Sequence, residues 1–229
     1  MPTIKSVPRK AGFWRQTFSE KTDSGELFWS LRRLAFGVAL SVKSDLGIGP
    51  INSVAYVTSR ILFIDLGLTI AIVYCGFVLL QLLVLGREFR PISFLQIGAS
   101  VLFGWFVSLN NHILSSFTLE VYGVQVLFVL GSAVIIALGI FLYLKADMIP
   151  HPPDGLILAI QKKTRWKLHN IKVCFDGTLV VFSAAISFIA LQRIIGLREG
   201  TIILVFGVGK IMGFLPKYLD PKINALFRL

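Results

Sequence analysis

A charged helix break occurs twice in this chain, and it restricts the possible folds more than any other feature. Near residue 43 an apolar run ends on a lysine and an aspartate, and Gly-x-Gly-Pro follows before apolar sequence resumes. A charge costs roughly 2.5–3.5 kcal/mol at the centre of a membrane helix, and Gly and Pro both interrupt helices. The same features return 102 residues later, which predicts a duplicated membrane protein with one broken helix in each half. The matched pairs are Lys43 and Lys145, Asp45 and Asp147, Pro50 and Pro152, and Asn52 and Asp154.

The composition of the chain supports the membrane class. Of its 229 residues, 55% are hydrophobic and only 15% are charged, whereas soluble domains contain about 25% charged residues. A net charge of +11 would suit a nucleic-acid partner, but the basic residues lie at the ends of apolar segments, as the positive-inside rule expects. We therefore expect an all-α, polytopic, multi-pass protein of the bacterial cytoplasmic (inner) membrane. Its basic groups then face anionic lipid rather than nucleic acid.

The sequence divides into four parts. The N-terminal residues are basic and lack the apolar core of a signal peptide, so we expect them to lie on the cytoplasmic side. The boundaries are residues 1–26 for a cytoplasmic basic N-terminal segment, 27–123 for membrane repeat 1, 124–217 for membrane repeat 2 and 218–229 for a cytoplasmic tail.

Apolar runs predict six full spans and two short segments. The spans are expected at residues 27–42, 66–85, 92–109, 124–144, 169–191 and 201–215. A short segment follows each break, at residues 51–65 and around residues 156–161. The first of these is shorter than the ~20 residues that a span needs, so we expect a half-helix or a re-entrant segment.

Two topologies remain open at this point. If the short segments do not cross the membrane, each half has three spans and the two repeats are inverted. Both termini, Arg87, Arg90 and the basic loop 162–167 are then cytoplasmic, and the loop 110–123, which has no Lys or Arg, lies outside. If the short segments do cross, eight spans form parallel repeats, and Arg87 and Arg90 lie outside. The lengths of the short segments favour six spans.

The paired motif resembles that of the YczE/YyaS/YitT-like bacterial integral membrane proteins. Lys-x-Asp-x-Gly-x-Gly-Pro-x-Asn from residue 43 and Lys-x-Asp-(x)4-Pro-x-Asp from residue 145 carry the resemblance, with two glycine-rich spans, over roughly residues 30–215. The second copy departs from the pattern because Ile149 and His151 replace the glycines, and Asn52 stands where the first copy often has Asp. The resemblance implies a polytopic inner-membrane transporter for which no substrate is well established.

The polar residues at the two breaks are the first candidates for binding a solute or an ion. Discontinuous helices in repeated halves are typical of transporter sites, so we expect Asp45, Asn52, Asp147 and Asp154 to converge on one polar cavity between the halves. The lysines would neutralise the carboxylates in the empty site. The alternative is that each carboxylate pairs with its local lysine at the membrane surface and caps the next turn. The candidates at the breaks are Lys43, Asp45, Asn52, Lys145, Asp147 and Asp154.

Asp176 and Lys210 complete the set of candidates, because both lie inside predicted spans. A charge left alone in such a place is costly, so we expect the two side chains to offset each other as an ion pair. A proton-coupling element is the functional alternative for the same two residues.

These features predict a secondary transporter or permease for a small polar or anionic solute, with a proton or cation as a coupling ion. A non-transport envelope or lipid-handling scaffold is the alternative. The chain has no nucleophile elbow, P-loop, His-Glu-x-x-His or Cys-x-x-Cys motif, so we expect no enzyme activity. Its three histidines lack ligand spacing, so we expect no metal and no other cofactor. The solute and a homo-oligomeric state stay open.

Overall fold

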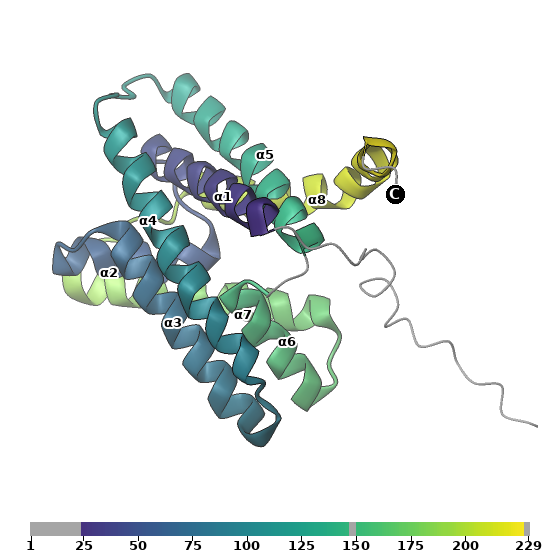
Figure 1. Cartoon of the computed structure of the whole chain (residues 1–229). Helices are drawn as coiled ribbons and strands as arrows, with labels where there is room; N and C mark the ends of the chain where they lie inside the picture. Colours follow the sequence, from purple (N-terminus) through teal and green to yellow (C-terminus); the bar gives the residue numbers. More distant parts are fainter. Residues whose placement is uncertain (1–23, 147–149, 227–229) are drawn as a thin grey trace, which may run out of the picture.

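The computed structural model describes residues 24–146 and 150–226, and it describes side chains over residues 27–144 and 150–215. In these residues the chain forms helices joined by short loops, without a strand. Figure 1 shows the arrangement. The α-helices are α1 (Ser24–Ser44), α2 (Pro50–Leu62), α3 (Leu66–Leu85), α4 (Leu95–Ser115), α5 (Tyr122–Ala146), α6 (Pro152–Thr164), α7 (Leu168–Leu191) and α8 (Glu199–Leu226), and two short 3-10 helices, η2 (Gly86–Glu88) and η3 (Pro91–Phe94), join α3 to α4.

Within the described residues, four helices are long and apolar enough to cross a membrane: residues 66–88, 91–115, 122–144 and 168–191. The exposed large hydrophobic side chains, such as Leu83 (76%) and Ile189 (75%), agree with a lipid-facing surface. Helix α1 is also 21 residues long, but Arg32, Arg33 and Lys43 interrupt its apolar character. The structure therefore supports an all-helical membrane protein.

The helix boundaries agree with the predicted spans in most places. Helix α3 covers the predicted range of 66–85, and α2 and α6 contain 13 residues each, about 20 Å of helix. The predicted loop 110–123 is too long, because α4 continues to Ser115. There Asn110 donates to the carbonyl of Phe106 at 2.8 Å and Ser115 donates to that of His112 at 2.6 Å, so these polar residues are accommodated within the helix. Helix α8 also continues beyond the predicted end at residue 215, to Leu226.

The first break is held by backbone contacts with the loop between α7 and α8. After α1 ends, Gly47 has a φ of 113°, and a Cβ there would lie 2.6 Å from the Thr201 hydroxyl, so only glycine suits this position. The amide of Ile48 donates to the carbonyl of Gly196 at 3.0 Å, and the amide of Gly200 donates to that of Leu46 at 2.8 Å. Pro50 then begins α2, where its missing N–H costs nothing. The first break therefore lies against the second half of the chain.

Glycine contacts position the longest helix pairs. Helix α1 packs along α5, and α3 along α4 (Figure 1). A Cβ on Gly67 would lie 2.0 Å from the carbonyl oxygen of Gly104, and one on Gly104 would lie 2.3 Å from that of Gly67. The backbones of α3 and α4 therefore touch, as expected for small residues between membrane helices.

The two short helices pack across the halves. Helix α2 contacts α7, and α6 contacts α3. Polar bonds hold α6 in place: the buried amide of Gln81 on α3 donates to Gln96 Oε1 on α4 at 2.9 Å and to the Pro152 carbonyl at 3.0 Å. Each break therefore lies at the junction between the first and second halves of the chain.

Candidate functional site

A buried histidine lies at the centre of an aromatic cluster, directly before α6. The rings of Tyr74, Phe103 and Tyr143 meet the imidazole of His151 edge to face, with centroids 4.9, 5.5 and 5.5 Å away. These rings come from α3, α4 and α5, so the cluster joins both halves of the chain at the second break. We call these four residues the histidine cage.

His151 has an unusual electrostatic position inside this cage. Its side chain is only 8% exposed, and its Nε2 atom has no hydrogen-bond partner in the described part of the chain. Burial, helped by the nearby Lys172 ammonium, lowers the pKa of His151 to about 3. The imidazole is therefore neutral at ordinary pH, with a ring nitrogen available to form a hydrogen bond with a ligand.

The first break reaches the same cage through Asn52, in the first turn of α2. The hydroxyl of Tyr74 donates to Asn52 Oδ1 at 2.8 Å. Tyr74 is buried and stacks on Phe103 with their rings 5.7 Å apart. One tyrosine thus touches both breaks, because its hydroxyl bonds to Asn52 and its ring lies against His151.

Two carboxyl groups lie on the second-half side of the cage. Asp154, in the first turn of α6, is partly buried, and burial raises its pKa while Lys172 opposes the rise. Asp176 on α7 interacts electrostatically with Asp154. The Oδ2 atom of Asp176 lies 3.4 Å from Lys172 Nζ, but its Oδ1 atom is buried without a hydrogen-bond partner among the described residues.

A polar hollow of about 430 Å³ opens where α1, α2, α3 and α4 meet. Its cations are Lys43, whose Nζ lies 3.5 Å from the Ser115 carbonyl, and Arg60, whose guanidinium lies 5.1 Å from the ring centre of Tyr56. The carboxylate of Asp65 caps α3 through the Leu68 amide at 2.9 Å. The full lining is Val42, Lys43, Asp45, Tyr56, Ser59, Arg60, Ile64, Asp65, Leu66, Asn111 and Ser115.

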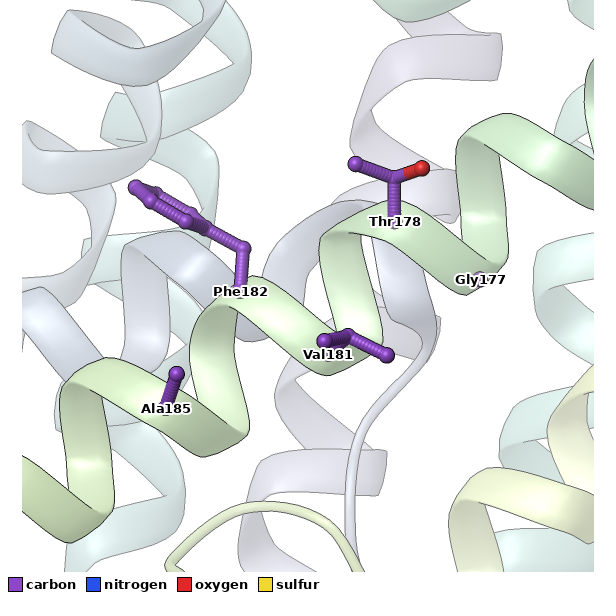
Figure 2. A pocket seen from close by; sticks show the side chains of 5 residues that line it. All are labelled: Gly177, Thr178, Val181, Phe182 and Ala185. Atoms are coloured by element: carbon purple, nitrogen blue, oxygen red, sulfur yellow. The ribbon is translucent and has the colours of Figure 1, made fainter.

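A second hollow, of about 480 Å³, lies on one side of α7 and has a different character (Figure 2). Its lining residues all come from this one helix, and Val181 and Phe182 are 69% and 53% exposed. This surface is apolar and suits lipid contact rather than recognition of a polar solute. Gly177, Thr178, Val181, Phe182 and Ala185 line it.

The structure brings together only part of the predicted site. Asn52 bonds to Tyr74, and Asp154 interacts electrostatically with the same tyrosine, as the sequence predicts for a site between the halves. The prediction for Asp45 is wrong: its side chain is 77% exposed, and its Oδ2 atom lies 4.0 Å from Arg198 at the surface. Asp45 takes a φ of 56° as the chain leaves α1, and this turn carries the side chain away from the cage. Lys43 and Asp45 line the polar hollow instead.

The predicted pairing of Asp176 with Lys210 is also corrected. Asp176 pairs with Lys172, one turn earlier on the same helix, because residues four apart lie on one face of a helix. Lys210 is exposed on α8. Asp147 and the side chain of Lys145 lie outside the described residues, so the structure does not test their predicted place in the site.

Sequence reasoning missed the residues that surround the two breaks. His151 had a signal, since it replaces a glycine of the repeated motif, and Lys172 had one in its spacing of four from Asp176. Tyr74 and Tyr143 had none, because aromatic residues are common in apolar helices. No group of three His, Cys, Asp or Glu side chains suited to a metal occurs in the part of the chain that the structure describes.

The chain belongs to a family of unknown function, DUF6198, whose model matches residues 27–217. No curated protein and no solved structure matches the chain. The match covers both breaks, the polar hollow and the histidine cage, and it assigns no activity to them. Nothing in it names the YczE/YyaS/YitT-like proteins that the paired motif resembles.

Proposed function

Starting from a family without an assigned function, we propose that this chain is a secondary transporter of a bacterial inner membrane. It has six spans in two inverted repeats, and it carries a small polar or anionic solute past the two helix breaks. The observation that carries the proposal is the histidine cage. Buried, partly unpaired polar groups at both breaks meet between the halves of an otherwise apolar helical protein, and such groups mark pathways in membrane proteins.

Ion pairs between loops support the six-span topology. Glu88, after α3, lies 2.7 Å from Lys162 Nζ and 2.8 Å from Lys163 Nζ, after α6. Eight spans would put Glu88 and these lysines on opposite sides of the membrane, whereas six spans put both on the cytoplasmic side. The contact of Lys43 with the Ser115 carbonyl favours six spans for the same reason, on the outer side. Both termini are then cytoplasmic.

A reciprocal contact supports the inverted repeats. A Cβ on Gly37 of α1 would lie 2.7 Å from the Ile136 side chain on α5, and one on Gly139 of α5 would lie 2.9 Å from the Leu34 backbone on α1. Gly139 and Ile136 are each 102 positions after Gly37 and Leu34. Equivalent residues therefore exchange places across one helix crossing, which is the signature of a two-fold axis.

The chemistry of the polar hollow and of the histidine cage supports a polar or anionic solute. Lys43 and Arg60 line the polar hollow, and Arg60 has no carboxylate partner among the described residues. Both carboxylates of the same hollow are already engaged: Asp65 accepts from Leu68 and Ser108, and Asp45 lies 4.0 Å from Arg198. An anionic group can therefore bind to the two cations at the entrance, and the neutral polar atoms of Asn52 and His151 lie deeper in the chain.

Alternating access then requires the short helices to move. Helices α2 and α6 each contact a helix of the opposite half, so a rocking motion between the halves changes which side of the membrane reaches the cage. The Asn52–Tyr74 bond and the contacts of Gln81 with Gln96 and Pro152 hold the arrangement that the structure shows. These bonds are the ones that such a motion would change.

The test is a thermal-shift screen of the purified protein followed by uptake into proteoliposomes. The probes are acetate, succinate, glutamate, glycine and inorganic phosphate. We expect at least one probe to stabilise the protein and to accumulate inside the vesicles. Arg60→Met and His151→Phe should each weaken the stabilisation at least tenfold. The control Glu120→Gln removes an exposed charge just before α5 and should leave the stabilisation unchanged.

The opposite result would favour the scaffold alternative. If no probe stabilises the folded protein and none enters the vesicles, the transport proposal is wrong. The same conclusion follows if the Arg60 and His151 variants bind the best probe as tightly as the Glu120 control.

A further inference from the structure

Two equivalent pairs of side chains differ in a way that points to a bound proton. Asn52 and Tyr74 in the first half correspond to Asp154 and Asp176 in the second, each 102 positions later. In the first pair the Tyr74 hydroxyl donates a hydrogen bond to Asn52. The second pair has two carboxyl groups, and a hydrogen bond between ionised carboxylates has no donor. A hydrogen bond between the equivalent side chains of the second half would require one added proton.

The surroundings of the carboxyl pair also favour a single proton. Among the described residues, Lys172 is the one ammonium that contacts Asp176, and it can balance one negative charge. The Oδ1 atom of Asp176 is buried and lacks a partner among the described residues, and Asp154 is partly buried. Asp154 acts electrostatically on Asp176, and like charges in surroundings of low polarity disfavour double ionisation, so the two groups titrate as a coupled pair.

The groups around Asp154 and Asp176 offer no better position for the proton than this carboxyl pair. Tyr74 on α3 and Tyr143 on α5 interact electrostatically with Asp154, and Lys172 on α7 faces both carboxyl groups. His151, three residues before Asp154, is more than nine-tenths buried, and its Nε2 atom is unpartnered among the described residues. The neutral imidazole of His151 does not compete for the proton, because burial keeps its pKa far below that of a free histidine.

We propose that Asp154 and Asp176 share one proton and that this proton is the ion coupled to solute movement. The inference rests on the proposed transport function for its second part only. With the proton bound, the pair carries one negative charge, which Lys172 balances. Loss of the proton breaks the O–H bond and leaves two carboxylates, one of them unbalanced, and this charge drives the pair to change its surroundings.

Infrared spectroscopy of the reconstituted full chain tests the shared proton without a known solute. A protonated carboxylic acid has its own carbonyl band, which shifts on exchange into heavy water. We expect wild-type protein to show this band at neutral pH and to lose it as the pH rises. Asp154→Asn and Asp176→Asn should each abolish it, because the remaining carboxyl beside Lys172 ionises. Glu120→Gln is the matched control and should keep the band.

Two results would overturn the shared proton. One is the absence of the band in the wild type; the other is its persistence in either single variant, which would mean that one carboxyl holds the proton alone. If the single variants do not fold, Asp154→Asn combined with Asp176→Tyr copies the Asn52–Tyr74 pair of the first half. This double variant should fold and lack the band, and a band in the folded double variant would contradict the proposal.

The coupling is tested separately in proteoliposomes with the best probe of the uptake screen. We expect a proton gradient directed into the vesicles to increase uptake by wild-type protein and to have no effect on uptake by the double variant. Uptake that ignores the gradient in wild-type protein overturns the coupling and leaves the transport proposal intact. A band without any uptake overturns the transport proposal and the coupling, and leaves the shared proton.

Discussion

The two halves of the chain contain helices in the same order but differ in the contacts that hold those helices together. In the first half, α3 and α4 touch through Gly67 and Gly104, and Tyr74 satisfies Asn52 with a neutral hydrogen bond. In the second half, no comparably close packing of α7 on α8 occurs among the described residues. The polar positions there carry Asp154 and Asp176 instead. The comparison indicates that neutral contacts fill these positions in the first half, whereas titratable carboxyl groups occupy the equivalent positions of the second half.

The largest effect is expected from breaking the glycine contact of the first half. In Gly67→Val, the new Cβ would lie 2.0 Å from the carbonyl oxygen of Gly104. That oxygen belongs to the backbone of α4, which cannot move aside without disturbing the packing of α3 on α4. We expect a loss of about 3 kcal/mol or more, seen as low yield and early thermal unfolding in detergent. Gly76→Val on the same helix is the control, because a Cβ there meets no atom within 4 Å. An equal loss in both variants would mean that helix propensity, not packing, is responsible.

The next effect comes from the buried amide that joins α3 to α6. Gln81→Leu leaves the amide of Gln96 and the carbonyl of Pro152 without the partner that they have now. Unpaired buried groups cost about 1–3 kcal/mol each, so we expect a clear fall in the unfolding temperature.

The matched position in the second half is Ser183, which donates only to the Val180 carbonyl of its own helix, at 3.1 Å. Ser183→Ala should therefore cost less than about 1 kcal/mol. Equal losses for Gln81→Leu and Ser183→Ala would show that the two halves depend on buried polar bonds to the same degree, which contradicts the comparison.

A series of stability measurements at different pH tests the histidine cage. Its His151 occupies the position that is equivalent to Gly49 of the first break. The folded protein keeps His151 neutral down to its pKa of about 3, whereas the unfolded chain binds a proton below pH 6.5. The unfolded state therefore binds more protons in this window, so stability falls as the pH drops from 6.5 towards 3. The slope from this one group is about 1.4 kcal/mol per pH unit.

His151→Phe keeps an aromatic ring in the cage and removes the titrating group. We expect its thermal unfolding to depend less steeply on pH than that of wild-type protein across this window. His112→Gln, an exposed histidine on α4, is the control and should keep the wild-type slope. A slope that is unchanged in His151→Phe would show that the cage does not exclude the proton.

The smallest effect concerns the first turns of α3 and α7. Asp65 caps α3 by accepting from the Leu68 amide, while Lys167 stands at the same position before α7 and makes no side-chain cap bond. Asp65→Ala should cost about 1 kcal/mol and Lys167→Asp should gain a similar amount. Thermal unfolding of both variants measures this difference, and a loss in Lys167→Asp would mean that the basic loop matters more than the cap.

The sequence by itself determined the elements of this protein and the position of its breaks. Apolar runs predicted α3 to the residue and placed the starts of the other long helices closely, because the composition of a membrane span is a local property. The ends of α4 and α8 lie beyond the predicted ones. The Gly and Pro residues of the repeated motif likewise predicted where α2 and α6 begin. Asn52 and Asp154 were identified in the same way, since each directly follows a break.

Only the tertiary structure decided which polar groups meet. Asp45 belongs to the repeated motif but turns to the surface towards Arg198, and Asp176 takes Lys172 rather than Lys210. His151 is surrounded by Tyr74, Phe103 and Tyr143, which come from three other helices. The physical reason is that a break dictates where the chain leaves a helix. The direction of each side chain depends on the backbone turn and on packing between residues far apart in sequence, and periodicity carries no information about either.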